Sequence, residues 1–318
     1  MTSSKLISTF CAAALAFATL PVQAQDVLKI AIGGRGALEA APPELGQDAG
    51  IFAKHGVKLE ILYTAGSGET LQSVISGAVD IGSGVGTAAA MGAYAKGAPI
   101  RVIGATMTGA SDSFWYVRGD SPVKTIQDFA GRSVAFSTAG SSTQAVVLGF
   151  RDHFKVDLKP VATGAQQATF TQVMSGQVDV GWSAGGTFLA EAEEGKTRII
   201  ARGNDLPYLR NVTPRLFIAN LDAVTRKRDL LIRFMRACRE TVDWIYADPA
   251  AMAAFGKWAG MTEAIATRAR DTAYADRAIN CDKIAGLEQV MGDAVKFKFL
   301  ATPLSEAQMG ELFVTGLR

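Results

Sequence analysis

The chain has 318 residues, of which 32 are Lys or Arg and 30 are Asp or Glu, giving a formal net charge of +2. This near balance gives no reason to expect a nucleic acid or an anionic membrane surface as a partner. Two histidines and three cysteines, scattered along the chain, do not supply the ligand spacing of a metal site. We therefore expect no cofactor and no metal. The length suffices for two compact domains.

The first 24 residues have the features of a secretory signal peptide. Lys5 precedes an apolar stretch at 6–20, and Val22-Gln-Ala24 fits the small-residue rule for cleavage. The stretch is shorter than a membrane span, and Cys11 lacks the residues expected before a lipidated cysteine. Cleavage after Ala24 would leave 31 basic and 30 acidic residues. We expect an exported, periplasmic and monomeric protein that is not inserted in the membrane.

From residue 28 onward, short β-branched runs alternate with helical segments, which is typical of a parallel sheet flanked by helices. The first series predicts strands at 28–32, 57–62, 79–82 and 100–105 and helices at 43–55, 68–76 and 87–96. A strand at 113–117 and a short helix at 125–131 follow. The pattern then restarts with strands at 133–136, 178–181 and 197–201 and helices at 143–154, 170–175 and 187–194.

After a strand at 215–219 the pattern becomes helical only. One helix is predicted from Asp222 through Trp244, Asp248-Pro249 supplies a helix start, and Ser305 with Gln308 forms a capping-box signature. A helical tail cannot bury its apolar face alone, so we expect it to pack on the first series. The predicted lobes are 25–112 plus 213–318 (lobe one) and 113–212 (lobe two), with hinge segments at 112–117 and 213–217.

One segment of the sequence occurs twice. Thr70–Gly82 returns as Thr169–Gly181 at an offset of 99 residues, and each copy runs from a helix through Ser-Gly into a short strand. Copies this far apart predict two similar lobes with a cleft between them. The aspartates of the copies, Asp80 and Asp179, are expected to cap or tie the adjacent turn.

A hydrolase is the alternative that the motifs raise. Gly181-Trp-Ser-Ala-Gly185 fits G-x-S-x-G, but that mechanism needs a histidine downstream of Ser183, and the histidines, His55 and His153, both precede it. The other copy, Gly82–Gly86, has glycine at the central position. We therefore expect a protein that is not an enzyme.

Two cysteines, Cys238 and Cys281, follow the predicted cleavage site. An exported compartment permits a disulfide between them. Cys238 also lies in an apolar stripe with Leu231, Phe234 and Ile245, so it could instead be a buried thiol. The sequence leaves both alternatives open.

The ligand-binding candidates lie where strand ends open into glycine, serine and threonine, because ligands of open α/β sheets bind there, beside helix starts that favour anions. Arg35 could pair with an anionic group, or it could be solvent-exposed. Trp115 and Trp182 could stack on a ligand, and for Trp115 core packing is an equal alternative. The serines and threonines could also be plain helix caps.

Gly50–Glu60, the two Ser-Gly-x-Val-Asp turns and Asp120–Ala135 together resemble extracytoplasmic solute-binding proteins of ABC importers, in the nitrate, sulfonate and taurine branch. They are similar also to thiamine-pyrimidine-binding proteins. The pyrimidine-synthase enzymes of this fold carry a cysteine-rich cluster that this chain lacks.

The resemblance implies an α/β, two-lobed type II periplasmic-binding-protein fold. Such a clamp would close on a small anionic organic solute, such as a sulfonate or carboxylate, and deliver it to a membrane permease. A sensor that reports the ligand to a membrane receptor is the alternative. Together with Trp115, which the resemblance does not include, the candidate binding residues are Gly34, Arg35, Ser67, Gly86, Thr87, Ser137, Ser141, Ser142 and Trp182.

Overall fold

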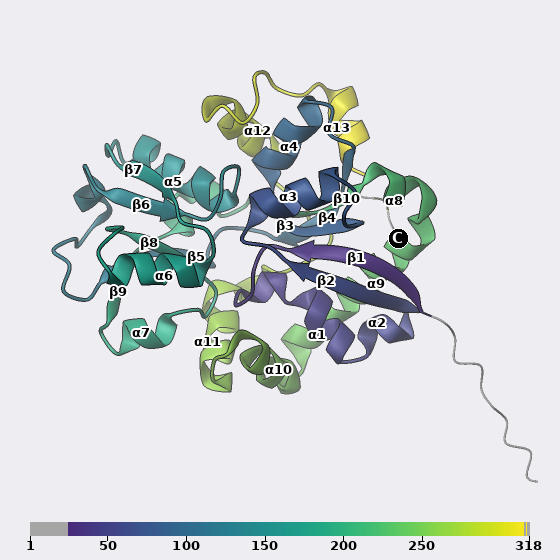
Figure 1. Ribbon diagram of the computed structural model, residues 1–318, viewed down its shortest axis with the longest axis horizontal. Coiled ribbons are helices and arrows are strands. Elements are labelled where there is room, and N and C mark those ends of the chain that lie inside the picture. The colour runs from purple at the N-terminus through teal and green to yellow at the C-terminus, as the bar shows by residue number, and fades with distance from the viewer. Residues whose placement is uncertain (1–24, 315, 317–318) are drawn as a thin grey trace, which may run out of the picture.

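A computed structural model describes residues 25–314 and 316 of the protein. The predicted signal peptide, residues 1–24, lies outside the described residues. Figure 1 shows two sheets, each flanked by helices, with the C-terminal helices gathered around one of them. The two-lobed fold predicted from the sequence is confirmed.

The sheet of lobe one has five strands in the order β2-β1-β3-β10-β4. Strand β1 runs parallel to β2 and β3, whereas β10 runs antiparallel to both β3 and β4. The strands are β1 (Asp26–Ile32), β2 (Val57–Tyr63), β3 (Ile81–Gly86), β4 (Ile100–Met107) and β10 (Arg215–Asn220).

Lobe two repeats this arrangement in two paired pieces. Strand β5 lies antiparallel between β8 and β9, and β6 pairs in parallel with β7. A parallel bridge from Val134 to Val180 joins the pieces, giving the order β7-β6-β8-β5-β9. The strands are β5 (Ser113–Arg118), β6 (Ser133–Phe136), β7 (Lys159–Ala162), β8 (Gly181–Ala184) and β9 (Thr197–Arg202). Strand β7 was not predicted.

The chain passes between the sheets twice, from β4 to β5 and from β9 to β10. Lobe two carries α5 (Ser142–His153), α6 (Gln166–Met174) and α7 (Leu189–Glu193). The other helices are α1 (Pro42–Asp48), α2 (Ile51–Lys54), α3 (Ser67–Ile75), α4 (Thr87–Ala95), α8 (Leu221–Arg226), α9 (Arg228–Ala247), α10 (Pro249–Ala259), α11 (Glu263–Ala273), α12 (Leu287–Lys296) and α13 (Glu306–Leu312). Short 3-10 helices span Leu38–Ala40, Ile126–Phe129, Gly203–Asp205, Pro207–Leu209 and Ala275–Arg277.

The C-terminal helices pack on lobe one, as expected. Helix α9 buries its apolar stripe, including Leu231, Phe234 and Ile245, in a core shared with β1 and α2. Helix α12 lies against α4, and α13 lies against β4 (Figure 1). Within residues 25–314, no helix is both long enough and apolar enough to cross a membrane.

Two predicted helices are broken. The segment 43–55 forms α1 and α2 because Gly50 between them adopts a left-handed φ of 76°. Residues 222–244 form α8 and part of α9, interrupted at Lys227, whose φ of −117° leaves the helical region. The predicted strands at 79–82 and 178–181 begin only at Ile81 and Gly181 as β3 and β8.

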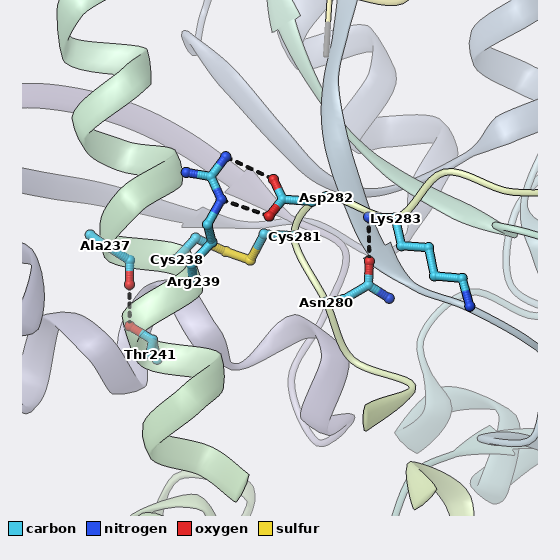
Figure 2. The surroundings of a disulfide bond; sticks show 8 residues. All are labelled: Ala237, Cys238, Arg239, Thr241, Asn280, Cys281, Asp282 and Lys283. Atoms are coloured by element: carbon cyan, nitrogen blue, oxygen red, sulfur yellow. Dashed lines mark hydrogen bonds and ion pairs between the residues drawn. A yellow bond between two sulfur atoms is a disulfide. The ribbon is translucent and has the colours of Figure 1, made fainter. Parts of the chain in front are cut away.

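A disulfide joins α9 to the loop before α12. Cys238 and Cys281 are bonded, with Cα atoms 6.4 Å apart, and Arg239 beside them forms an ion pair with Asp282 (Figure 2). The carbonyl oxygen of Cys281 accepts a hydrogen bond from the backbone N–H of Ala105 on β4. The bond therefore fastens the C-terminal segment to both α9 and the edge of the lobe-one sheet.

Candidate ligand-binding site between the lobes

The repeated segments hold equivalent strands in place. Asp80 accepts a hydrogen bond from the backbone N–H of Lys29 at 2.9 Å, and Asp179 accepts one from the backbone N–H of Ser133 at 2.9 Å. Burial alone would raise the pKa of Asp179, but hydrogen bonds from Ser133 and Arg132 outweigh it and hold that pKa below its usual value. The aspartates thus have a structural role, with the neighbouring strand and not the Ser-Gly turn as partner.

Two pairs of threonines fix the turns that lead into α3 and α6. The hydroxyl oxygens of Thr64 and Thr70 lie 2.7 Å apart, and those of Thr163 and Thr169 lie 2.6 Å apart. The pairs are related by the same offset of 99 residues as the aspartates. Each lobe therefore presents a helix start at the carboxyl end of its sheet in the same way.

These ends line a cavity between the lobes, which we call the polar chamber. Among the predicted residues, the chamber is lined by Gly34, Arg35, Ser67, Ser137, Ser141, Ser142 and Trp182. Further lining residues are Gly33, Ala37, Glu39, Ala40, Gly66, Ser83, Gly84, Ser113, Thr143, Gln166, Ala184 and Arg215.

Three residues of the polar chamber carry buried donor atoms without a partner among the described residues. They are Ser83 Oγ, Trp182 Nε1 and Arg215 Nε. The other buried side-chain atoms left without a partner, on Tyr116, Thr187 and Arg198, belong to residues that do not line the chamber. An unpaired buried donor costs roughly 1–3 kcal/mol, so a hydrogen-bond acceptor that reached one of these atoms would stabilise it.

A buried ionic cluster forms the floor of the polar chamber. The guanidinium of Arg215 forms ion pairs with Glu39 and, at 2.7 Å, with Asp112, while Tyr274 donates a hydrogen bond to Glu39 at 2.7 Å. Burial raises the pKa of Glu39, Asp112 adds to the rise, and Arg215 opposes it. Burial alone would lower the pKa of Arg215, but both carboxylates raise it, so its charge is retained. Each carboxylate is thus held by donors of the protein.

The starts of α3 and α5 lie at the polar chamber. Ser141 caps α5, since its hydroxyl oxygen accepts from the N–H of Gln144 at 3.1 Å. The hydroxyl oxygen of Ser67 accepts from the N–H of Gly86 at 2.8 Å. These serines therefore combine a capping or tying role with their place in the lining. The first N–H groups of a helix have no partner within the helix and carry partial positive charge, which favours an anion.

Arg35 lies at the edge of the polar chamber with protein partners of its own. Its guanidinium forms an ion pair with Glu44 at 2.6 Å and lies over the rings of Tyr63, at 4.6 Å, and Trp258, at 5.7 Å. The side chain is 53% exposed. Its position therefore combines both alternatives left open by the sequence, a place in the lining and solvent exposure.

Three predicted residues lie outside the polar chamber. Trp115 is fully buried in lobe two, where its indole N–H donates to the carbonyl oxygen of Ala135 at 2.9 Å. Its ring packs edge to face against Phe150 of α5, with 4.9 Å between the ring centroids. Thr87 donates to the carbonyl oxygen of Thr213 at 2.6 Å, and Gly86 lies against Gly140.

The segments that follow the two repeats meet only in part across the cleft. Gly84 and Trp182 both line the polar chamber. Gly86 and Thr87, however, lie with the start of α5 along a second cavity, and Thr187 packs against Gly36. The first residues of the two segments therefore line one chamber together, whereas the last residues do not.

Sequence reasoning missed Glu39, Ser83, Ser113, Gln166 and Arg215 as lining residues. One of them carried a signal, because Ser83 precedes Trp182 by 99 residues and so occupies its place in the other copy. Arg215 and Ser113 begin the two crossing strands β10 and β5. Their positions depend on how the lobes come together, which strand patterns do not specify.

Ser183 does not form a nucleophile arrangement. Its hydroxyl lies 2.6 Å from Gln166 Oε1 and 3.0 Å from the carbonyl oxygen of Thr187. His55 lies 2.8 Å from Glu240, and His153 packs on Phe154, so neither histidine reaches it. Over the described range there is also no group of His, Cys, Asp and Glu that could hold a metal ion.

Solved structures of low sequence identity share this fold. The alkanesulfonate-binding protein SsuA from Xanthomonas axonopodis pv. citri, bound to MOPS, superposes with a TM-score of 0.74 at 17% identity, covering 91% of this chain and 98% of that one. The nitrate-binding protein NrtA from Synechocystis PCC 6803 gives 0.73 at 13%, covering 92% and 87%. The desulfurization enzyme DSZB gives 0.62 at 14%, covering 92% and 97%. The fold therefore occurs in periplasmic binding proteins and in an enzyme.

At the level of sequence, no curated protein matches the chain. A family model described as NMT1/THI5 like matches residues 40–252. This segment includes most of the lobe-one sheet, all of lobe two and both crossings. The match extends over more than half of the chain, and the protein therefore belongs to the NMT1/THI5-like family.

Proposed function

We propose that this protein is a periplasmic solute-binding protein of an ABC importer that binds a small anionic organic solute in the polar chamber. The observation that carries the proposal is the set of three unpartnered donors, on Ser83, Trp182 and Arg215. All three can donate to a carboxylate or sulfonate oxygen, and the two helix starts favour its charge. The ionic cluster on the floor supplies no acidic group free of donors to oppose the anion.

Delivery to a membrane permease is supported by family and fold. By their names, an aliphatic sulphonate binding protein from Escherichia coli and the nitrate-binding protein, both of this fold, are periplasmic. We propose that 25–112 with 213–318 and 113–212 act as the two arms of a clamp. Contacts between the arms, such as the hydrogen bond from Gly68 N–H to Thr138 Oγ1 at 3.0 Å, would hold the clamp closed around the solute.

Calorimetric titration of the purified protein with methanesulfonate, butanesulfonate, acetate, butyrate and nitrate tests the proposal. We expect an organic anion to bind. Trp182→Phe keeps the aromatic ring and removes the donor, and should weaken binding by about tenfold to a hundredfold, as should Ser83→Ala. Trp244→Phe is the matched control, because the Trp244 indole on α9 already donates to the exposed Asp248, the residue after that helix.

Two results would overturn the proposal. One is that none of the organic anions binds. The other is that Trp182→Phe and Ser83→Ala both bind with the affinity of the unsubstituted protein. Small-angle scattering with and without the bound anion tests the clamp separately, since closure should lower the radius of gyration.

Arg35 stays a predicted ligand contact. Its bond to Glu44 leaves further guanidinium donors for an anion at the chamber edge. Arg35→Ala should weaken anion binding by roughly tenfold to a hundredfold if one of those donors is used. Unchanged affinity in calorimetry would restrict Arg35 to its contacts with Glu44, Tyr63 and Trp258.

A further inference from the structure

A second cavity adjoins the polar chamber. We call it the apolar chamber. Four residues line both cavities, namely Ser113, Ser141, Ser142 and Arg215. The two cavities therefore meet at the floor and at the start of α5, where the unpartnered Nε of Arg215 is found.

The walls of the apolar chamber come from both lobes and from the C-terminal segment. Lobe two supplies Val146 on α5 and Leu209, and the C-terminal segment supplies Val290 on α12 with Phe297 and Phe299 after it. Val146, Leu209 and Val290 are each buried to at least nine-tenths of their surface. This lining contrasts with the serines and glycines of the polar chamber.

The position of the C-terminal wall is fixed by packing. Gly92 on α4 has no side chain, and a Cβ there would lie 2.3 Å from the carbonyl oxygen of Phe299. Lys296, at the end of α12, also pairs with Asp152 of lobe two. The wall is thus held against both lobes.

Asp293 is the acidic residue that lines the apolar chamber. Burial raises the pKa of its carboxyl above the usual value, while nearby Lys296 opposes the rise. Its placement among apolar walls gives no support for a second anionic group on the solute. The chamber instead offers surface from which an apolar group would displace water.

We infer that the solute is amphiphilic, with its anionic head in the polar chamber and an aliphatic or aromatic tail that passes Ser113 and Ser142 into the apolar chamber. The inference rests on the proposed function and narrows its ligand class. An inorganic oxyanion such as nitrate would fill only the polar end. A linear tail of several carbons uses both cavities at once.

The test is calorimetric titration with two homologous series, the n-alkanesulfonates and the n-alkanecarboxylates, each from one to eight carbons. Burying one methylene contributes roughly fourfold in affinity. We expect the affinity to rise by about that factor per carbon over the first several members and then to level off when the chamber is full.

A filling substitution locates the tail. Ala145 on α5 lines the apolar chamber and is partly exposed, so Ala145→Leu should be tolerated and should occupy the space. We expect it to abolish the rise with chain length while the one-carbon anion binds within about twofold of the unsubstituted protein. Ala192→Leu on α7, also partly exposed and outside both chambers, is the matched control.

The outcomes separate the two proposals. If the short anions bind but affinity is flat along both series, or if Ala145→Leu leaves the rise unchanged, the tail inference is wrong and the proposed function stands. If no member of either series binds, both are wrong. If the affinity rises with chain length, and Ala145→Leu but not Ala192→Leu abolishes that rise, both proposals are supported.

Discussion

The two lobes have the same framework but different chemistry at equivalent places. Both sheets place a crossing strand antiparallel in the fourth position, and both fasten a neighbouring strand through an aspartate. Yet the position after the repeat is Ser83 in lobe one and Trp182 in lobe two, and both carry an unpartnered donor. The shared framework therefore sets where these donors lie, and the differing side chains place a hydroxyl at this position in lobe one and an indole in lobe two.

The crossing strands differ in the same way. Strand β10 begins with Arg215, whereas β5 begins with Ser113, and both residues line the polar chamber. Only the arginine brings a positive charge, and it forms ion pairs with Glu39 and Asp112. The asymmetry shows that repeated frameworks do not require repeated electrostatics, because one buried cation needs its own carboxylates nearby.

The largest effect should come from removing that charge. Arg215→Met leaves two buried carboxylates without their cation, and we expect it to lower the free energy of unfolding by roughly 3–5 kcal/mol in urea titrations. Arg226→Met is the control, since this side chain is 77% exposed in its pair with Asp222 and should cost less than about 1 kcal/mol. Equal effects of the two substitutions would show that the Arg215 cluster is not what distinguishes the crossing strands.

The disulfide tests another asymmetry, because lobe two has no cysteine. Cys238→Ser with Cys281→Ser should lower the free energy of unfolding by about 2–4 kcal/mol, since the bond closes a loop of 43 residues. In thermal melts, reductant should lower the melting temperature of the unsubstituted protein and leave that of the double variant unchanged. A melting temperature that ignores reductant in both proteins would contradict the prediction.

Substitution of the two equivalent aspartates should lower stability by different amounts, because the aspartates differ in burial. Asp80 is 16% exposed and also pairs with Lys227, whereas Asp179 is 42% exposed. Asp80→Asn should cost about 1.5 kcal/mol of unfolding free energy, and Asp179→Asn about 0.5 kcal/mol, because solvent weakens the second set of bonds. Parallel urea titrations measure both values. A larger loss for Asp179→Asn than for Asp80→Asn would mean that burial does not determine how much each aspartate stabilises the fold.

The smallest expected effect is a change in pH dependence. Because the pKa of Asp179 is held below its usual value, its carboxylate stabilises the fold above about pH 4, and this contribution is lost as the pH falls through the lower folded-state pKa. As the pH decreases, the urea midpoint of Asp179→Asn should therefore fall less steeply than that of the unsubstituted protein. If the urea midpoints of the two proteins depend equally on pH below pH 4, Asp179 does not contribute to the acid sensitivity.

The fold was predictable from the sequence to the extent that its elements are amphipathic or repeated. The helices at the apolar stripe of α9 and before the two Ser-Gly segments were found from the sequence, because their apolar residues recur at helical spacing and are the residues that pack in the core. Strand β7 was missed because Lys159–Ala162 is short and only half-buried, so no alternation marks it. Its pairing with β6 is determined by the sheet and not by its own residues.

The site was predictable where it follows the local turn. The glycines and serines at strand ends line the chamber, as Gly34 and Ser137 show. Trp115 was not separable from Trp182 by sequence, because both stand in short strands and both are buried, and only the structure shows that Trp182 lines the chamber. Glu39 and Arg215 are 176 residues apart and meet only once the chain returns to lobe one with β10.

The two crossings also have a consequence for the order of folding. All strands of lobe two lie between residues 113 and 202, so that sheet can form from one continuous stretch of chain. The lobe-one sheet has β10 at an inner position, where Ala219 pairs with Ile81. Until β10 arrives, the edges of β3 and β4 stay unpaired, and contacts this distant in sequence form slowly. We therefore expect lobe two to fold first and lobe one to complete last.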